Sequence, residues 1–303
     1  KRANNAHTHT TNNHMPSRIP LLLLPLAAQA LVLPTRAPQA NLRAGALSAA
    51  RAAARPTQPT VDARTLKVSM LDAAKPLKVG VVGVTGAVGE EIIEVLANRN
   101  FPVSELKLFA SARSAGKTME TPSGPMTIEE FSVDAARECD VVFLAVSGDF
   151  ALEYAEKISA DGGALVIDNS SAFRYNDKVP LVVPEINAEV ARRMKAKLIA
   201  NPNCTTAIAL MALAPLHEAF GIKRCIMSTY QAASGAGAPG MRELEEGVKD
   251  KIEGRPVSND VFAHPLPFNV IPHIDKFLDD RYTKEERKVT WETRKIMGLP
   301  DLP

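Results

Sequence analysis

The chain reads Leu77-Lys-Val-Gly80-Val-Val-Gly83-Val-Thr-Gly86-Ala-Val-Gly89, a short apolar run that enters a glycine-rich turn. We expect a buried strand over 77–82 and a helix over 88–98, because the apolar residues after the turn recur at helical spacing. Glycines in such a turn let the backbone approach a pyrophosphate, which the positive end of the helix attracts. The spacing of Gly83, Gly86 and Gly89 is a variant of the dinucleotide-binding pattern, and a purely structural turn is the alternative interpretation.

Further short apolar runs at 105–110, 140–146 and 164–167 alternate with helical patterns. Strands separated by helices are typical of parallel βαβ units. We therefore predict an α/β fold in which a Rossmann-type, doubly wound parallel sheet occupies residues 77–204.

The pattern changes after Cys204, where a long apolar helix is expected over 205–220. Pro215 lies inside that helix and is expected to kink it or divide it in two, because proline removes a backbone hydrogen bond. A strand is predicted next, over 222–231.

A glycine-rich loop then precedes a charged helix at about 241–253. Thr283 and Glu286 form a capping box, which starts a last helix that runs to about residue 297. Together these elements predict an α+β catalytic and dimerisation domain over 205–303, with its carboxyl-terminal part missing.

Residues 1–76 are predicted to be a targeting leader and linker outside the folded protein. No acidic residue precedes Asp62, and Arg, Ala, Ser and Thr dominate the segment. The apolar run at 19–33 is too short and too rich in proline to span a membrane well. A signal peptide from Met15, followed by an Arg/Ala-rich transit segment to about residue 65, predicts a plastid protein. A simple plastid or mitochondrial transit peptide is the alternative.

Basic charge is concentrated in this leader, which holds ten of the 36 basic residues and two of the 34 acidic residues. The rest of the chain therefore carries six more acidic than basic side chains, which argues against nucleic-acid binding. The mature protein is also expected to have no membrane partner. Three cysteines without CxxC spacing predict neither a disulfide framework nor a metal site. Cys139 and Cys225 are interpreted as small core residues.

Cofactor preference is predicted from the end of the second expected strand, which reads Phe109-Ala-Ser-Ala-Arg113-Ser114. NAD-binding domains usually place a carboxylate there to accept from the ribose 2′-hydroxyl. Here no carboxylate occurs, and the Arg113 guanidinium is available for a 2′-phosphate. The sequence favours NADP over NAD, with a solvated loop arginine as the alternative interpretation.

Cys204 lies in Asn201-Pro-Asn-Cys204-Thr-Thr206, immediately before the long helix. Peptide dipoles and free N–H groups at a helix amino terminus stabilise a thiolate over a thiol. A thiolate can attack an acyl carbon, and the resulting thioester can accept a hydride from a nicotinamide. We therefore regard Cys204 as a candidate nucleophile.

The Cys204 motif and Gln231-Ala-Ala-Ser-Gly-Ala-Gly237 resemble the active-site signatures of the aspartate-semialdehyde dehydrogenase family. The glycine turn, Asp168-Asn-Ser-Ser-Ala-Phe-Arg174 and Val183-Pro-Glu-Ile-Asn187 are similar to that family as well, so the resemblance runs from about Leu77 to the end of the chain. It implies that NADPH reduces L-aspartyl 4-phosphate to L-aspartate 4-semialdehyde with release of phosphate. This reaction leads toward lysine, threonine, methionine and isoleucine. The resemblance further implies a homodimer or a homotetramer.

The same resemblance implies roles for individual residues. Cys204 would be the thioester-forming nucleophile and Gln231 would orient the substrate. The substrate-binding residues would be Asn203, Arg174 for the phosphate, Glu285 for the substrate amine and Lys288 for the phosphate; without the family, Glu285 and Lys288 read as a surface ion pair. The cofactor-binding residues would be Gly83, Thr85, Gly86, Ala87, Val88, Arg113, Ser114, Ser234 and Gly235. His217, His264 and His273 match no catalytic position and are interpreted as structural.

One departure from the family pattern lies at the end of the sequence. Family members continue past the segment that matches Pro303, and their later part supplies a substrate-binding arginine and a general-base histidine. General acid–base groups contribute about 10²- to 10⁴-fold to a rate. We expect an incomplete gene model or fragment, with little or no activity as it stands.

Two other functions remain open from the sequence. N-acetyl-glutamyl-phosphate reductase is a related cysteine enzyme, although Thr205-Thr206 after the cysteine favours the aspartyl enzyme. A non-catalytic homologue that serves as a partner subunit is the second alternative. The joint presence of Cys204, Gln231 and Arg174 argues against it.

Overall fold

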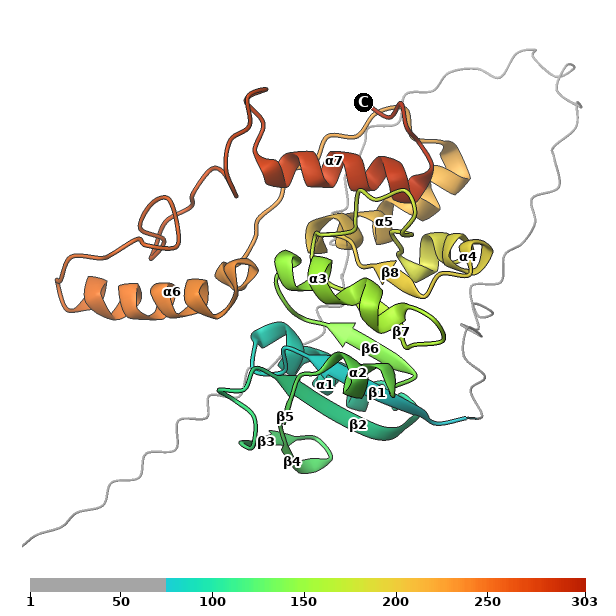
Figure 1. Cartoon of the computed structure of the whole chain (residues 1–303). Coiled ribbons are helices and arrows are strands. Elements are labelled where there is room, and N and C mark those ends of the chain that lie inside the picture. The colour runs from blue at the N-terminus through green and yellow to red at the C-terminus, as the bar shows by residue number, and fades with distance from the viewer. Residues whose placement is uncertain (1–74) are drawn as a thin grey trace, which may run out of the picture. The chain divides into compact units, whose positions relative to one another are not determined.

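The computed structural model describes residues 75–303 (Figure 1). The targeting leader and the plastid address predicted for residues 1–76 lie outside the described residues, apart from the last two positions. A search of the described part of the chain finds no helix with the length and apolarity that crossing a membrane requires.

A six-stranded sheet forms the centre of the described chain, in the order β5-β2-β1-β6-β7-β8, with all neighbours parallel. Its strands are β1 (Leu77–Val82), β2 (Val103–Ala110), β5 (Glu129–Glu130), β6 (Val141–Leu144), β7 (Leu165–Asp168) and β8 (Leu198–Ala200). The chain moves outward from β1 in both directions, so the strand order reverses between β1 and β6. This topology confirms the predicted Rossmann-type doubly wound sheet.

Helices cover both faces of this sheet (Figure 1). Because successive strand residues point to opposite faces, Val81 and Val82 of β1 belong to two different hydrophobic clusters. One cluster includes Ile93 and Leu96 of α1 (Ala87–Asn98), and the other includes Ile158 of α3 (Gly148–Ser159). Burial on both faces explains why the central strands β6 and β7 are almost wholly apolar, with no alternation of apolar and polar residues.

The sequence patterns missed several short elements. These are α2 (Val133–Arg137), α4 (Pro184–Met194) and the antiparallel hairpin of β3 (Thr118–Thr121) and β4 (Gly124–Thr127). The hairpin lies outside the main sheet and its residues are mostly half-exposed.

The carboxyl-terminal region contains α5 (Cys204–Phe220), a short 3₁₀ turn η1 (Ala233–Ala236), α6 (Gly237–Ile252) and α7 (Lys284–Met297). Thr283 and Glu286 make the predicted capping box at the start of α7. Division of the long helix at Pro215 was wrong, since α5 continues through it. Pro215 deprives the Met211 carbonyl of its donor, and Met211 is exposed, so water can supply the missing bond.

The predicted strand over 222–231 was also wrong, because this segment is irregular. Ile226 is 81% exposed and Tyr230 is 91% exposed. Within residues 75–303 no strand pairs with the segment, and the single hydrogen bond from the Cys225 N–H group to the Pro303 oxygen does not make a ladder. Cys225 is accordingly only half-buried, whereas Cys139 is buried as predicted.

Candidate active site

The two motifs singled out in the sequence follow strands of the same parallel sheet. The glycine turn follows β1, and the segment 201–203 leads from β8 into Cys204. The carboxyl ends of parallel strands gather at one edge, which is where α/β sheets bind ligands. Strands β6 and β7 separate β1 from β8, so the two motifs lie three strand spacings apart, roughly 14 Å.

Two glycines shape the turn after β1. Gly83 has a φ of +88°, and a Cβ atom there would overlap the Ala145 carbonyl oxygen of the neighbouring strand end. A Cβ atom on Gly89 would overlap the Gly83 carbonyl oxygen, so the close approach of α1 to the turn needs a glycine. These positions have a steric reason to be glycine.

The amino terminus of α1 is open. Its N-cap residue is Gly86, which offers no side chain to the first-turn N–H groups. Ala87 and Val88 are the first two residues of the helix, and the side chains of Thr85 and Val88 are exposed. Free N–H groups together with the helix dipole suit an anion such as a pyrophosphate.

The turn after β2 lies next to the glycine turn, because Val82 pairs with Phe109 at the ends of the two parallel strands. Arg113 is exposed in this turn, and the Ser114 N–H group donates to the Ser111 oxygen at 2.8 Å. No carboxylate occurs between 109 and 114. This placement fits a group that meets the ribose end of a dinucleotide.

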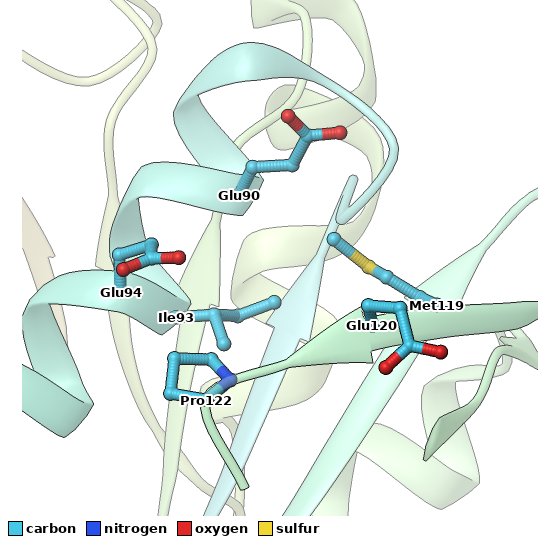
Figure 2. A pocket seen from close by; sticks show the side chains of 6 residues that line it. All are labelled: Glu90, Ile93, Glu94, Met119, Glu120 and Pro122. Carbon is cyan, nitrogen blue, oxygen red and sulfur yellow. The ribbon is translucent and has the colours of Figure 1, made fainter. Parts of the chain in front are cut away.

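A shallow hollow lies between α1 and β3, where Glu90, Ile93, Glu94, Met119, Glu120 and Pro122 surround it (Figure 2). None of the predicted cofactor residues lines it. Three carboxylates would repel a phosphate, so this hollow does not serve the pyrophosphate.

Cys204 is exposed and is the first residue of α5. The preceding residue, Asn203, is the N-cap of the helix. Its Oδ1 atom accepts from the backbone N–H groups of Thr205 at 2.9 Å and Thr206 at 3.3 Å. Asparagine is among the best N-cap residues, so Asn203 sets where α5 begins and places Cys204 at the amino-terminal end of the helix.

Helix α7 reaches the same N-cap residue through Glu285, which is itself paired with Lys288. Glu285 accepts from the Asn203 Nδ2 atom at 2.7 Å, and the Lys288 ammonium lies 3.1 Å from Glu285 and 2.9 Å from Asp275. Burial opposes the charge of Lys288, but the bonds to Asp275 and Glu285 outweigh it and raise the pKa of Lys288. The pair is therefore more than a solvated surface ion pair, because it touches the residue before the cysteine.

Arg174 is buried under the nucleophile loop, defined as residues 201–203. Its Nε atom donates to the Asn201 oxygen at 2.8 Å, and its NH2 atom donates to the Asn169 oxygen at 3.1 Å. Its NH1 atom lies 3.2 Å from Oε1 of Glu292. A guanidinium has five N–H donors, so two remain for a substrate phosphate.

Glu292 was not singled out in the sequence. It is fully buried, and its Oε2 atom accepts from the Asn203 backbone N–H group at 2.6 Å. Burial raises the pKa of Glu292, and the Arg174 guanidinium opposes that rise. Glu292 lies seven residues after Glu285, which places both on one face of α7. This spacing was the signal in the sequence that could have identified Glu292.

Gln231 and the glycine-rich loop form a separate group in the described chain. The Gln231 Oε1 atom is buried and has no hydrogen-bond partner within residues 75–303. A Cβ atom on Gly235 would overlap the Gln231 side chain, so the loop packs closely on it. Ser234 is exposed in the same turn. No hydrogen bond within residues 75–303 joins Gln231 to the nucleophile loop, so their predicted pairing stays a prediction.

The histidines of the described region have local structural contacts. His217 Nδ1 accepts from the Ile222 N–H group at 3.1 Å, and His264 and His273 pack ring against ring at 6.3 Å. Within residues 75–303 no group of three or more His, Cys, Asp or Glu is arranged to hold a metal ion.

Comparison with known proteins gives the class. Residues 78–194 match the family model for the NAD-binding domain of semialdehyde dehydrogenases, and residues 213–303 match the model for their dimerisation domain. Within that class, the aspartate-semialdehyde dehydrogenases of Synechocystis and Aquifex aeolicus are each 45% identical to this chain. The chain belongs to the aspartate-semialdehyde dehydrogenase family, as its motifs predicted.

The matches cover most of the folded chain. They span 75% and 73% of this chain, and 67% and 65% of the two relatives, so the chain spans about two thirds of their length. The crystal structure of aspartate-semialdehyde dehydrogenase II from Vibrio cholerae, complexed with ASA, matches with a TM-score of 0.71 and 41% identity over 76% of this chain and 68% of that one. The enzyme from Candida albicans with NADP matches with a TM-score of 0.53 and 28% identity over 74% and 60%.

Proposed function

We propose that the protein reduces L-aspartyl 4-phosphate to L-aspartate 4-semialdehyde with NADPH, in the synthesis of lysine, threonine, methionine and isoleucine. The observation that carries the proposal is the exposed Cys204 at the start of α5, on the same sheet edge as an open glycine turn. Family membership supports the reaction, because the relatives named above are aspartate-semialdehyde dehydrogenases.

In this proposal the Cys204 Sγ atom attacks the acyl carbon of the substrate. The bond from that carbon to the phosphate oxygen breaks, phosphate leaves, and a thioester remains on the enzyme. Arg174 and Lys288 bind the phosphate, and Glu285 binds the substrate amine. The buried Oε1 atom of Gln231, which has no hydrogen-bond partner within residues 75–303, can orient the substrate.

NADPH fits the residues at the other end of the edge. Gly83, Gly86 and the first N–H groups of α1 would hold the pyrophosphate, Arg113 and Ser114 the 2′-phosphate, and Ser234 with Gly235 the nicotinamide half. When bound, NADPH supplies the hydride that converts the thioester into the aldehyde and frees the cysteine.

Thiol labelling tests this proposal without depending on turnover. Cys204 of the whole chain should react with iodoacetamide, and NADP plus phosphate should protect it. Aspartate semialdehyde should protect it at concentrations where N-acetylglutamate semialdehyde does not. Protection by the second aldehyde alone would favour the glutamyl enzyme, and labelling insensitive to every ligand would favour a non-catalytic homologue.

Assembly and location are further parts of the proposal. A homodimer or homotetramer is supported by the match of 213–303 to a dimerisation domain and by exposed apolar residues on α5, such as Ile208 and Phe220. Sedimentation would test it, and a monomer would contradict it.

A plastid location is supported by the composition of residues 1–76, with a mitochondrion as alternative. A fluorescent fusion of residues 15–76 tests the address, and a diffuse cytosolic signal would contradict both.

A further inference from the structure

The ion pair between Arg174 and Glu292 lies directly behind the nucleophile loop. The Glu292 side chain is fully buried and that of Arg174 is 9% exposed. Burial of an ion pair is weak evidence for a role in stability, because well-packed apolar residues often serve as well or better. The groups that the pair contacts therefore indicate what else it does.

The pair forms hydrogen bonds with both ends of the nucleophile loop. At one end Arg174 donates to the Asn201 oxygen at 2.8 Å, and at the other end Glu292 accepts from the Asn203 N–H group at 2.6 Å. Asn203 is the N-cap of α5, and Cys204 is the next residue. Asn203 therefore sets the position of the Cys204 backbone, and Glu292 in turn fixes Asn203 by accepting from its N–H group.

The chemistry of a glutamate suits this double task. Its two oxygens accept from two different donors, Arg174 NH1 and Asn203 N, at the same time. A glutamine of the same length has only one acceptor oxygen, so one of the two donors would face an NH₂ group. An aspartate keeps the charge but is one methylene shorter, so it cannot reach both donors.

We propose that Glu292 is a positioning residue for the nucleophile, acting through Asn203 to hold Cys204 at the start of α5. This inference rests on the proposed function, in which Cys204 is the nucleophile. A loosened loop would let Cys204 move away from the first-turn N–H groups that favour its thiolate.

The experiment measures iodoacetamide labelling of each cysteine by peptide mass spectrometry across a range of pH, in the whole chain and three variants. Glu292→Gln and Glu292→Asp test the two properties of the carboxylate. Glu246→Gln, exposed on α6, is the charge-matched control. Cys139 is an internal control for global opening, because it is buried in the core against the sheet and becomes reactive only when the fold opens.

In both Glu292 variants Cys204 should be labelled about tenfold more slowly at neutral pH, while Cys139 stays unlabelled. Glu246→Gln should match the unchanged chain. If Cys204 in either Glu292 variant were labelled at the same rate as in the unchanged chain at every pH, the inference alone would be overturned. A slower Cys204 accompanied by labelling of Cys139 in proportion would also overturn it, since it would mean a purely structural role. A Cys204 no more reactive than a free thiol in the unchanged chain would overturn the proposed function, and the inference with it.

Discussion

Asn203 and Glu285 lie 82 residues apart in the chain, yet the Asn203 Nδ2 atom donates to the Glu285 carboxylate at 2.7 Å. The same Asn203 side chain caps α5 through its oxygen. One amide therefore joins the helix that carries the candidate nucleophile to the helix that carries the candidate substrate-binding pair. The active site depends on contacts that are distant in sequence.

Asn203→Ala removes both contacts of that amide. Loss of an N-cap costs about 1 kcal/mol, and the unpaired Glu285 adds to that cost, so the free energy of unfolding should fall by about 2 kcal/mol. Chemical denaturation measures the change. Ser147→Ala is the matched control, because Ser147 caps α3 through Phe150 without reaching α7. Equal losses in the two variants would contradict a role for the Glu285 contact.

Two glycines of the nucleotide turn should respond differently to alanine. Gly89→Ala places a methyl group against the Gly83 carbonyl, so unfolding should become easier by about 1–3 kcal/mol. Gly86→Ala meets no atom closer than 3.5 Å and should leave the stability of the fold almost unchanged. Both should weaken NADPH binding, which calorimetry measures. Normal binding by Gly86→Ala would argue against an anion at this helix end.

Local patterns in the sequence predicted the parts of the structure that depend on local physics. The strand and turn from Leu77 to Gly89 and the Thr283 capping box are set by residues that lie next to each other. The segment 222–231 has β-forming residues, but a strand also needs a neighbour, which no local pattern supplies.

Glu292 was missed for a related reason. In a helix with many charged residues, a glutamate is normally solvated, and only the tertiary contact with Arg174 and Asn203 makes it a buried group. The sequence could place Glu285 and Lys288 on one helix face through their spacing of three, and the family resemblance implied their roles. The ion pair that holds the loop from behind required the structure.

Arg113 should decide the preference between the two nicotinamide cofactors. Arg113→Ala removes a charge that would pair with the 2′-phosphate, so the dissociation constant of NADPH should rise by about tenfold or more. Binding of NADH, which lacks that phosphate, should change little. Fluorescence titration with both cofactors measures the ratio, and an equal weakening of both would mean that Arg113 serves the fold or the shared part of the cofactor. Arg99→Ala, exposed at the end of α1, is the control.

Lys288 should give the folded protein a characteristic dependence on pH. Burial opposes ionisation of Asp275, but the hydrogen bonds from Lys288 and from the Lys276 N–H group, together with the charges of Lys288 and Lys284, lower the pKa of Asp275 below its usual value of 3.8. The pKa of Lys288 is raised above 10.5. A lowered carboxyl pKa stabilises the fold above about pH 4, and that stability is lost as the pH falls through the folded-state pKa. A raised lysine pKa stabilises the fold below about pH 10, and that stability is lost as the pH rises further.

Lys288→Met should therefore lower the free energy of unfolding by about 1 kcal/mol at pH 7. The difference from the unchanged chain should shrink at pH 3 and again above pH 11. Denaturation at several pH values measures it, with Lys249→Met, exposed on α6, as the control. A difference that stayed the same from pH 3 to pH 7 would mean that the methylene stem of Lys288, and not its charge, stabilises the site.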